Sequence, residues 1–84
     1  MFISQADQQI YDINKALSSN NLVEVGSIAH KLKGSALNLG AEALAETCKK
    51  IELKGREMDG EGMEALVKQL GQELILTKSE LKAL

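Results

Sequence analysis

Apolar residues recur every three or four positions along nearly the whole chain, which is the spacing of one face of an α-helix. Four such stripes follow one another, and strand-like alternation of apolar and polar residues is absent. The stripes predict four amphipathic helices. Their positions are Ile3, Ala6, Ile10, Ile13 and Leu17; Leu22, Val25, Ala29, Leu32, Ala36 and Leu39; Ala41, Leu44, Cys48 and Ile51; and Met63, Val67, Leu70, Leu74, Thr77, Leu81 and Leu84.

Polar and glycine-rich segments separate the stripes and predict where the helices end. The first helix stops at the polar residues 18–21. Asn21 with Glu24 three residues later resembles a capping box at the start of the second helix. Gly40 supplies a stop for that helix, and the third helix follows after almost no linker. The third helix is expected to fade in a loop before the fourth, marked by Gly55, Asp59, Gly60 and Gly62.

Four amphipathic helices with short connections predict an all-α fold, an up-and-down four-helix bundle that forms one domain over residues 1–84. The composition agrees, because good helix formers dominate and the 84 residues include neither proline nor tryptophan. A continuous coiled coil is the competing interpretation. The glycine-containing breaks argue against it, since an isolated helix of about four turns is marginally stable without partners.

Charge and cysteine content narrow the classes of partner. The net charge is −2, no long run of lysine or arginine occurs, and one Tyr and one Phe offer no stacking platform, which argues against nucleic-acid binding. No stretch approaches the roughly 20 apolar residues of a membrane span, and no signal peptide is evident. The single cysteine, Cys48, has no partner for an internal disulfide. We therefore expect a cytoplasmic, monomeric domain without membrane contact.

The only histidine, His30, lies near the middle of the predicted second helix. At 100° per residue its side chain points about 140° away from the apolar stripe, toward solvent. Gly26 and Gly34 lie one turn on either side of it, although a glycine inside a helix costs roughly 1 kcal/mol relative to alanine. We interpret both glycines as clearing the space around the imidazole for another molecule's backbone. The outer-face neighbours of the histidine are Val23, Gly26, Ser27, Lys33, Gly34 and Leu37, and Lys31 lies on a neighbouring flank.

This pattern has a plain alternative, since a lone surface histidine is usually only solvated polar surface. The two glycines and the nearby Lys33 favour a functional group, and neutral imidazole is a good nucleophile near physiological pH. A metal site would need further ligands, and Cys48 belongs to the core stripe of another helix. A hydrolase triad would need a buried carboxylate that orients the imidazole, which we do not expect in so small a bundle. The residues favour a histidine that accepts a group from a partner and returns it.

The segment "HKLKG" at residues 30–34, with Gly40 six residues later, resembles the signature of histidine phosphotransfer (HPt) domains, His-x-x-Lys-Gly. The longer segments "AHKLKGSALNLGAEALAETCKKIE" and "FISQADQQIYDINKALSSNNLVEV" are similar to the same family, so the resemblance covers nearly the whole chain. It implies that His30 is the phospho-accepting residue. Lys33 then matches the lysine that stabilises the phosphoryl group, Gly34 the glycine that admits the partner, and Gly40 a turn glycine.

The resemblance also implies a role in a two-component phosphorelay. His30 would take a phosphoryl group from an aspartyl phosphate on one response-regulator receiver domain and pass it to another. The expected partners are receiver domains and a sensor kinase, and the receiver supplies the magnesium ion. The domain itself is expected to bind no cofactor and no ATP, and whether it counts as an enzyme, or is a piece of a hybrid sensor histidine kinase, stays open. The expected partner-binding residues are Val23, Gly26, Ser27, Lys31, Leu37 and Asn38.

Two other functions stay open at this point. A non-catalytic helical adaptor would keep the apolar outer surface but would not need His30 together with Lys33 and Gly34. The phospho-accepting domain of a chemotaxis-type kinase would receive its phosphoryl group from the ATP-binding domain of a kinase instead of a receiver. The sequence contains neither a kinase nor a receiver portion, so it does not exclude this alternative, although the length of the chain favours the relay.

Overall fold

A computed structural model describes the backbone of residues 2–83 and the side chains of residues 5–80. Over these residues the chain forms four α-helices, which confirms the predicted all-α fold. The stripe positions Ile3, Leu81 and Leu84 lie outside the residues whose side chains are described. Among the described helices, none is both long enough and apolar enough to cross a membrane. The helices are α1 (Phe2–Ser18), α2 (Leu22–Leu39), α3 (Glu42–Arg56) and α4 (Met63–Ala83).

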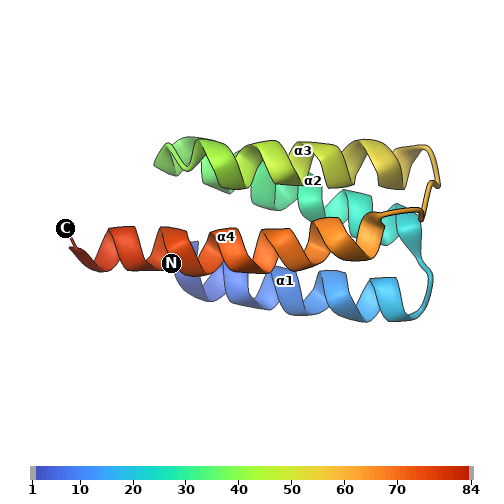
Figure 1. Ribbon diagram of the computed structural model, residues 1–84, viewed down its shortest axis with the longest axis horizontal. Coiled ribbons are helices and arrows are strands. Elements are labelled where there is room, and N and C mark those ends of the chain that lie inside the picture. The colour runs from blue at the N-terminus through green and yellow to red at the C-terminus, as the bar shows by residue number, and fades with distance from the viewer. Residues whose placement is uncertain (1, 84) are drawn as a thin grey trace.

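The helices lie lengthwise beside one another in an up-and-down bundle (Figure 1). α2 and α3 form one antiparallel pair, α1 and α4 form the other, and both connections between the pairs lie at the same end of the molecule. The bundle measures 38 × 19 × 19 Å. α2 and α3 share the most extensive contact. The short connections explain the arrangement, because helices joined by a short loop must lie side by side and run in opposite directions.

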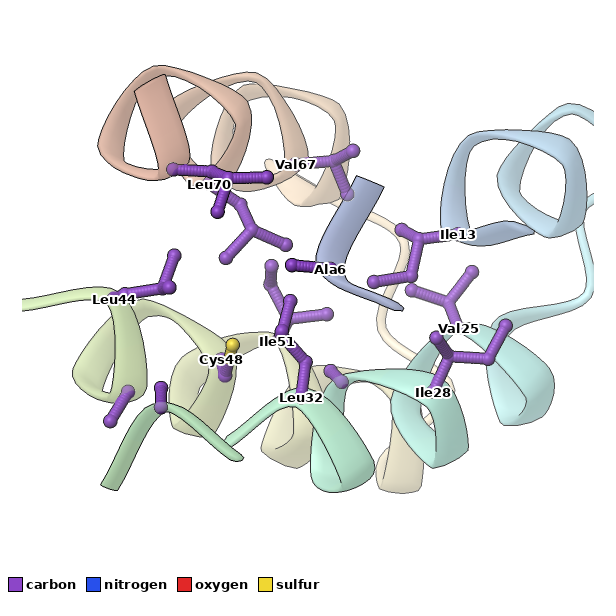
Figure 2. Close-up of a cluster of buried hydrophobic side chains, with 14 of the residues drawn as sticks. Ala6, Ile13, Val25, Ile28, Leu32, Leu44, Cys48, Ile51, Val67 and Leu70 are labelled. Carbon is purple, nitrogen blue, oxygen red and sulfur yellow. The ribbon is translucent and has the colours of Figure 1, made fainter. Parts of the chain in front are cut away.

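The predicted stripes meet along the axis of the bundle (Figure 2). Ile13 of α1, Leu32 of α2, Ile51 of α3 and Leu70 of α4 are completely buried. Each such burial contributes roughly 1.5–3 kcal/mol, so these contacts hold the four helices together. Cys48 lies in the same core, and burial raises the pKa of its thiol to about 12. The cysteine therefore acts as a small apolar side chain.

α2 begins and ends where the sequence predicts, but only half of the capping box forms, because the backbone N–H of Asn21 donates to the carbonyl oxygen of Ala16 at 2.9 Å. Asn21 Oδ1 accepts a hydrogen bond from the backbone N–H of Glu24 at 3.2 Å. Gly40 caps the other end with a φ of 75°, the left-handed conformation that glycine adopts without strain. Leu39 was expected in the core, but its side chain is 44% exposed. It is the last residue of α2, so neighbouring helices surround it on fewer sides.

α3 is longer than the sequence indicates. Gly55 was predicted in the following loop, but it lies inside α3, which continues to Arg56. The glycine is buried there, because the missing side chain lets the backbone of α3 approach that of α2. The loop itself begins after Arg56 and contains Asp59, Gly60 and Gly62 as predicted.

Candidate functional site

His30 lies midway along α2 with its side chain 64% exposed, so its predicted outward orientation is confirmed. Val23 and Leu37, seven residues before and after it, are exposed apolar side chains on the same side of the helix. Ser27 and Gly34 are exposed between them. These five residues form a surface, here called the histidine face, that is apolar at its ends and open around the imidazole. Its role in binding a partner stays a prediction.

Gly34 has the free surroundings that the sequence predicts. A Cβ atom added at this position would meet no heavy atom within 4 Å other than the neighbouring backbone of its own helix. Packing within the bundle therefore does not require the glycine, which leaves access for a partner as its predicted role. Lys31 and Asn38, the other expected partner-binding residues, are also exposed.

Gly26 does not belong to the histidine face, and its predicted outward position is wrong. It is buried against α3, where an added Cβ would lie 3.3 Å from both the carbonyl oxygen of Glu52 and the Cα of Gly55. A Cβ added to Gly55 would lie only 2.7 Å from the carbonyl oxygen of Leu22 and 2.8 Å from the Cα of Gly26. The contact with α3 thus extends further around α2 than the apolar stripe indicates. The two glycines bring the helix backbones together.

This close approach places a carboxylate under the imidazole. The side chain of Glu52 on α3 is only 10% exposed, and its Oε2 lies 2.8 Å from His30 Nδ1. The expectation that so small a bundle lacks a buried carboxylate to orient the imidazole is therefore wrong. The reason is the contact of Gly26 with Gly55, since a longer distance between α2 and α3 would leave the carboxylate out of reach.

The carboxylate determines which nitrogen of the imidazole is free. Lys33 Nζ donates to Glu52 Oε1 at 2.7 Å. This bond, helped by the one from His30, holds the pKa of the Glu52 carboxyl below its ordinary value of 4.5. An ionised carboxylate has only acceptor atoms, so Nδ1 of His30 must be the donor. In the neutral ring the lone pair then lies on Nε2, which becomes the nucleophilic atom.

Arg56 is a second cation on the same carboxylate. Its Nη2 donates to Glu52 Oε2 at 2.9 Å, the same oxygen that accepts from His30. The Arg56 side chain is 69% exposed, whereas that of Lys33 is 25% exposed. Lys33 therefore lies near the histidine as predicted, but its ammonium group is bonded to Glu52. We refer to His30, Lys33, Glu52 and Arg56 as the His30 cluster.

A hollow opens on one side of the imidazole between α2 and α3. His30 and Arg56 both line it. The remaining lining residues are Val23, Gly26, Ser27, Glu52 and Gly55. Its lining thus combines His30 and two charged residues with one apolar and three small residues.

The sequence pattern does not indicate Glu52 or Arg56 as residues of the site. Glu52 is 22 residues from His30 and lies on another helix. Two features of the sequence point to Glu52. It follows Ile51 at the edge of an apolar stripe, and Arg56 lies four residues later, at the spacing of a favourable ion pair within a helix. Such a signal indicates a polar group turned toward a neighbouring helix, but it does not indicate which residue it meets.

Residues 1–80 match the family described as Hpt domain. The chain belongs to the Hpt domain family. This finding confirms the family that the segment around His30 predicts. No solved structure matches the chain at a significant level.

This Hpt domain is also similar to three named proteins. It is 34% identical over 59 residues to phosphorelay intermediate protein YPD1 of Candida albicans, covering 70% of this chain and 32% of that protein. It is 36% identical over 61 residues to multistep phosphorelay regulator 1 of Schizosaccharomyces pombe, covering 70% and 21%. It is 36% identical over 59 residues to phosphorelay intermediate protein YPD1 of Saccharomyces cerevisiae, covering 69% and 35%. The match thus spans about a third of the two YPD1 proteins and about a fifth of the regulator.

Proposed function

We propose that this Hpt domain is an intermediate of a phosphorelay. His30 accepts a phosphoryl group from an aspartyl phosphate on one receiver domain and returns it to the aspartate of another. The observation that carries the proposal is an exposed imidazole whose Nδ1 is held by Glu52, so that Nε2 is the free nucleophile. Membership of the Hpt family and the phosphorelay names of the relatives support the same role.

The transfer step needs no proton to leave the site. The Nε2 lone pair attacks phosphorus, the bond between phosphorus and the aspartyl oxygen breaks, and its electron pair stays on the aspartate as a carboxylate. The ring becomes positively charged, and Nδ1–H stays bonded to Glu52, which stabilises that charge. In the reverse direction the N–P electron pair returns to Nε2. Catalysis in this scheme consists of positioning and charge stabilisation.

The histidine face is the docking surface in this proposal. The apolar residues Val23 and Leu37 give the receiver surface to pack on, and Gly34 leaves room for its backbone beside the imidazole. The receiver supplies the magnesium ion, and a sensor kinase phosphorylates the first receiver. We further propose that the domain acts as a monomer in the cytoplasm.

The test uses a panel of receiver domains that carry a radiolabelled aspartyl phosphate. At least one receiver is expected to transfer its label to the parent domain as an acid-labile phosphohistidine. The His30→Gln variant should stay unlabelled and keep the helical circular dichroism of the parent. Lys50→Gln, an exposed position on α3, is the matched control and should label at the parent rate.

The outcomes separate the proposal from its alternatives. Labelling of the His30→Gln variant at the parent rate would contradict the proposal. Labelling only by the ATP-binding domain of a kinase, and by no receiver, would instead support a chemotaxis-type phospho-acceptor. Receiver binding without any transfer would support a non-catalytic adaptor.

A further inference from the structure

We propose that Arg56 is the residue that binds the phosphoryl group on His30, while Lys33 remains bonded to Glu52. The inference rests on the proposed phosphorylation of His30. The sequence assigns stabilisation of the phosphoryl group to Lys33. In this proposal Arg56 binds the phosphoryl group and Lys33 binds Glu52.

The first observation is the position of the guanidinium group relative to the imidazole. Arg56 Nη2 and His30 Nδ1 bond to the same oxygen atom, Glu52 Oε2. The distance between Arg56 Nη2 and His30 Nδ1 therefore cannot exceed the sum of the two nitrogen–oxygen distances. Arg56 and His30 also line the same hollow, whereas Lys33 is not among its lining residues. Arg56 thus lies beside the imidazole on its Nδ1 side, and its exposed side chain has to turn around the ring to reach a phosphoryl group on Nε2.

The second observation is the difference in exposure between the two cations. The Arg56 side chain is 69% exposed and that of Lys33 only 25%. The Lys33 ammonium has donors to spare, but its bond to Glu52 Oε1 holds it against a carboxylate that is itself only 10% exposed, so any movement toward the outward-facing imidazole would strain that bond. Withdrawing a partner from a largely buried charge is costly. Arg56 faces no comparable obstacle, because much of its side chain is already in solvent.

The donor inventory of arginine permits both contacts at once. A guanidinium group has five N–H donors in a planar fork, and Glu52 engages Nη2. The other nitrogens remain available for a phosphoryl group, which arginine binds in a bidentate manner. Arg56 can therefore reach the phosphoryl group by a rotation of its exposed side chain.

The charges of the His30 cluster fit this assignment. With a neutral imidazole, Lys33 and Arg56 carry two positive charges and Glu52 one negative charge, so the cluster has a net charge of +1. Phosphorylation adds a group with two negative charges and makes the ring cationic at Nδ1. The cluster then becomes neutral. The unphosphorylated site thus has the positive charge that a phosphoryl group needs, and Arg56 is its exposed part.

The experiment measures the half-life of phosphohistidine without any receiver. Phosphoramidate, a small-molecule donor, is used to phosphorylate the domain, and ³¹P NMR follows the loss of the phosphohistidine signal at pH 8. We expect Arg56→Ala to shorten the half-life about tenfold, as the loss of a charge-assisted contact predicts. Arg56→Lys should restore it only in part, and Lys33→Ala, which acts only through Glu52, should shorten it less than Arg56→Ala does. The ³¹P chemical shift should move in Arg56→Ala, which a merely structural role of Arg56 would not produce in a folded domain.

Lys50→Ala is the matched control, because it removes one positive charge from an exposed position of the same helix. It should leave half-life and chemical shift unchanged. A tenfold shortening in Lys33→Ala with a normal half-life in Arg56→Ala would overturn the inference and leave the proposed function intact. Equal effects of Arg56→Ala and Lys50→Ala would also overturn it, since they would show only a dependence on net charge. Transfer from receivers, measured separately, tests the proposed function itself.

Discussion

Glu52 accepts hydrogen bonds from three side chains at once, those of His30, Lys33 and Arg56. A carboxylate as covered as this one would be costly without such partners. The bond from Lys33, with a smaller contribution from His30, keeps it ionised, and the ionised carboxylate orients the imidazole through Nδ1. The nucleophilic character of His30 therefore depends on residues that lie far from it in the sequence.

The contribution of Glu52 to stability should depend on pH. Its folded-state pKa lies below the ordinary 4.5, mainly because of the bond from Lys33. A carboxyl with a lowered pKa stabilises the fold fully above its unfolded pKa, and this stabilisation is lost as the pH falls through the folded value. We expect Glu52→Gln to unfold at lower urea concentration than the parent at pH 7. The difference in free energy of unfolding should shrink steadily below about pH 4.5. A difference that stays constant from pH 7 to pH 3 would contradict the assignment.

Substitutions of Gly34 should separate stability from transfer. Because a Cβ there meets nothing within 4 Å, Gly34→Ala should stabilise the domain by up to about 1 kcal/mol. Gly34→Gln should fold at least as well as the parent but accept phosphate from a receiver much more slowly, since its side chain stands where the receiver must approach. Thermal melts and transfer time courses on the same samples provide the measurement. A Gln variant that transfers at the parent rate would show that the glycine is not needed for access.

For single residues, the sequence predicts the features that depend on one helix alone. The outward direction of His30 follows from its angular distance to the stripe on its own helix, and the structure confirms it. The bond from His30 to Glu52 joins α2 to α3. It depends on the distance between the two helices and on how each is rotated about its axis. Neither quantity is encoded in the spacing of apolar residues along one helix.

At the scale of helices, the pair α2 and α3 is the element that builds the site. Gly26 and Gly55 face each other where the two backbones meet, and each would bring a Cβ to 3.3 Å or less from the other helix. The sequence pattern predicts Gly26 as a gap for a partner and Gly55 as part of a loop. A glycine within a helix indicates that another backbone approaches closely. Whether that backbone belongs to a partner or to a neighbouring helix depends on the tertiary structure.

Alanine substitutions of two helical glycines should have opposite effects. A Cβ on Gly55 would lie 2.7–2.9 Å from backbone atoms of α2, which cannot yield like a flexible side chain. We expect Gly55→Ala to destabilise the domain by about 2 kcal/mol, in the range for overpacking. Gly71→Ala on α4 meets nothing within 4 Å and should stabilise by up to about 1 kcal/mol. Urea unfolding of both variants measures this difference.

Gly55→Ala should also disturb the site. Moving α3 away from α2 lengthens the bond between Glu52 and His30, which the ¹⁵N chemical shift of Nδ1 would report. A Gly55→Ala variant as stable as Gly71→Ala, with an unchanged Nδ1 shift, would show that the close approach of the helices is not required.

For the whole molecule, the apolar pattern predicts the bundle well. Positions such as Leu32, Ile51 and Leu70 need only to face inward, and four stripes of suitable length have few other ways to be covered. The pattern fails at the edges of the stripes. Ile28 is buried although it lies outside its stripe, and Leu39 is exposed although it lies within one. These positions depend on where neighbouring helices begin and end.

Charge is arranged unevenly over the molecule, and this should affect the rate of association with a receiver. The domain carries −2 overall, yet Lys33 and Arg56 bond to the carboxylate that holds His30, and the exposed Lys31 follows His30 in the chain. Local charge of one sign steers a partner of the opposite sign, an effect that salt screens. Lys31→Glu should therefore lower the association rate with a receiver severalfold at 20 mM salt and have little effect at 0.5 M.

Lys50→Glu makes the same change in net charge. Lys50 lies two residues before Glu52, which is about 200° around the helix, so it is on the other side of α3. It should slow association much less than Lys31→Glu. Stopped-flow association at several salt concentrations measures both variants. Since Lys31 makes no contact with Glu52 in the described cluster, the phosphohistidine half-life should stay at the parent value in Lys31→Glu. Equal slowing by the two substitutions would mean that net charge, rather than the cations around His30, guides the receiver to the histidine face.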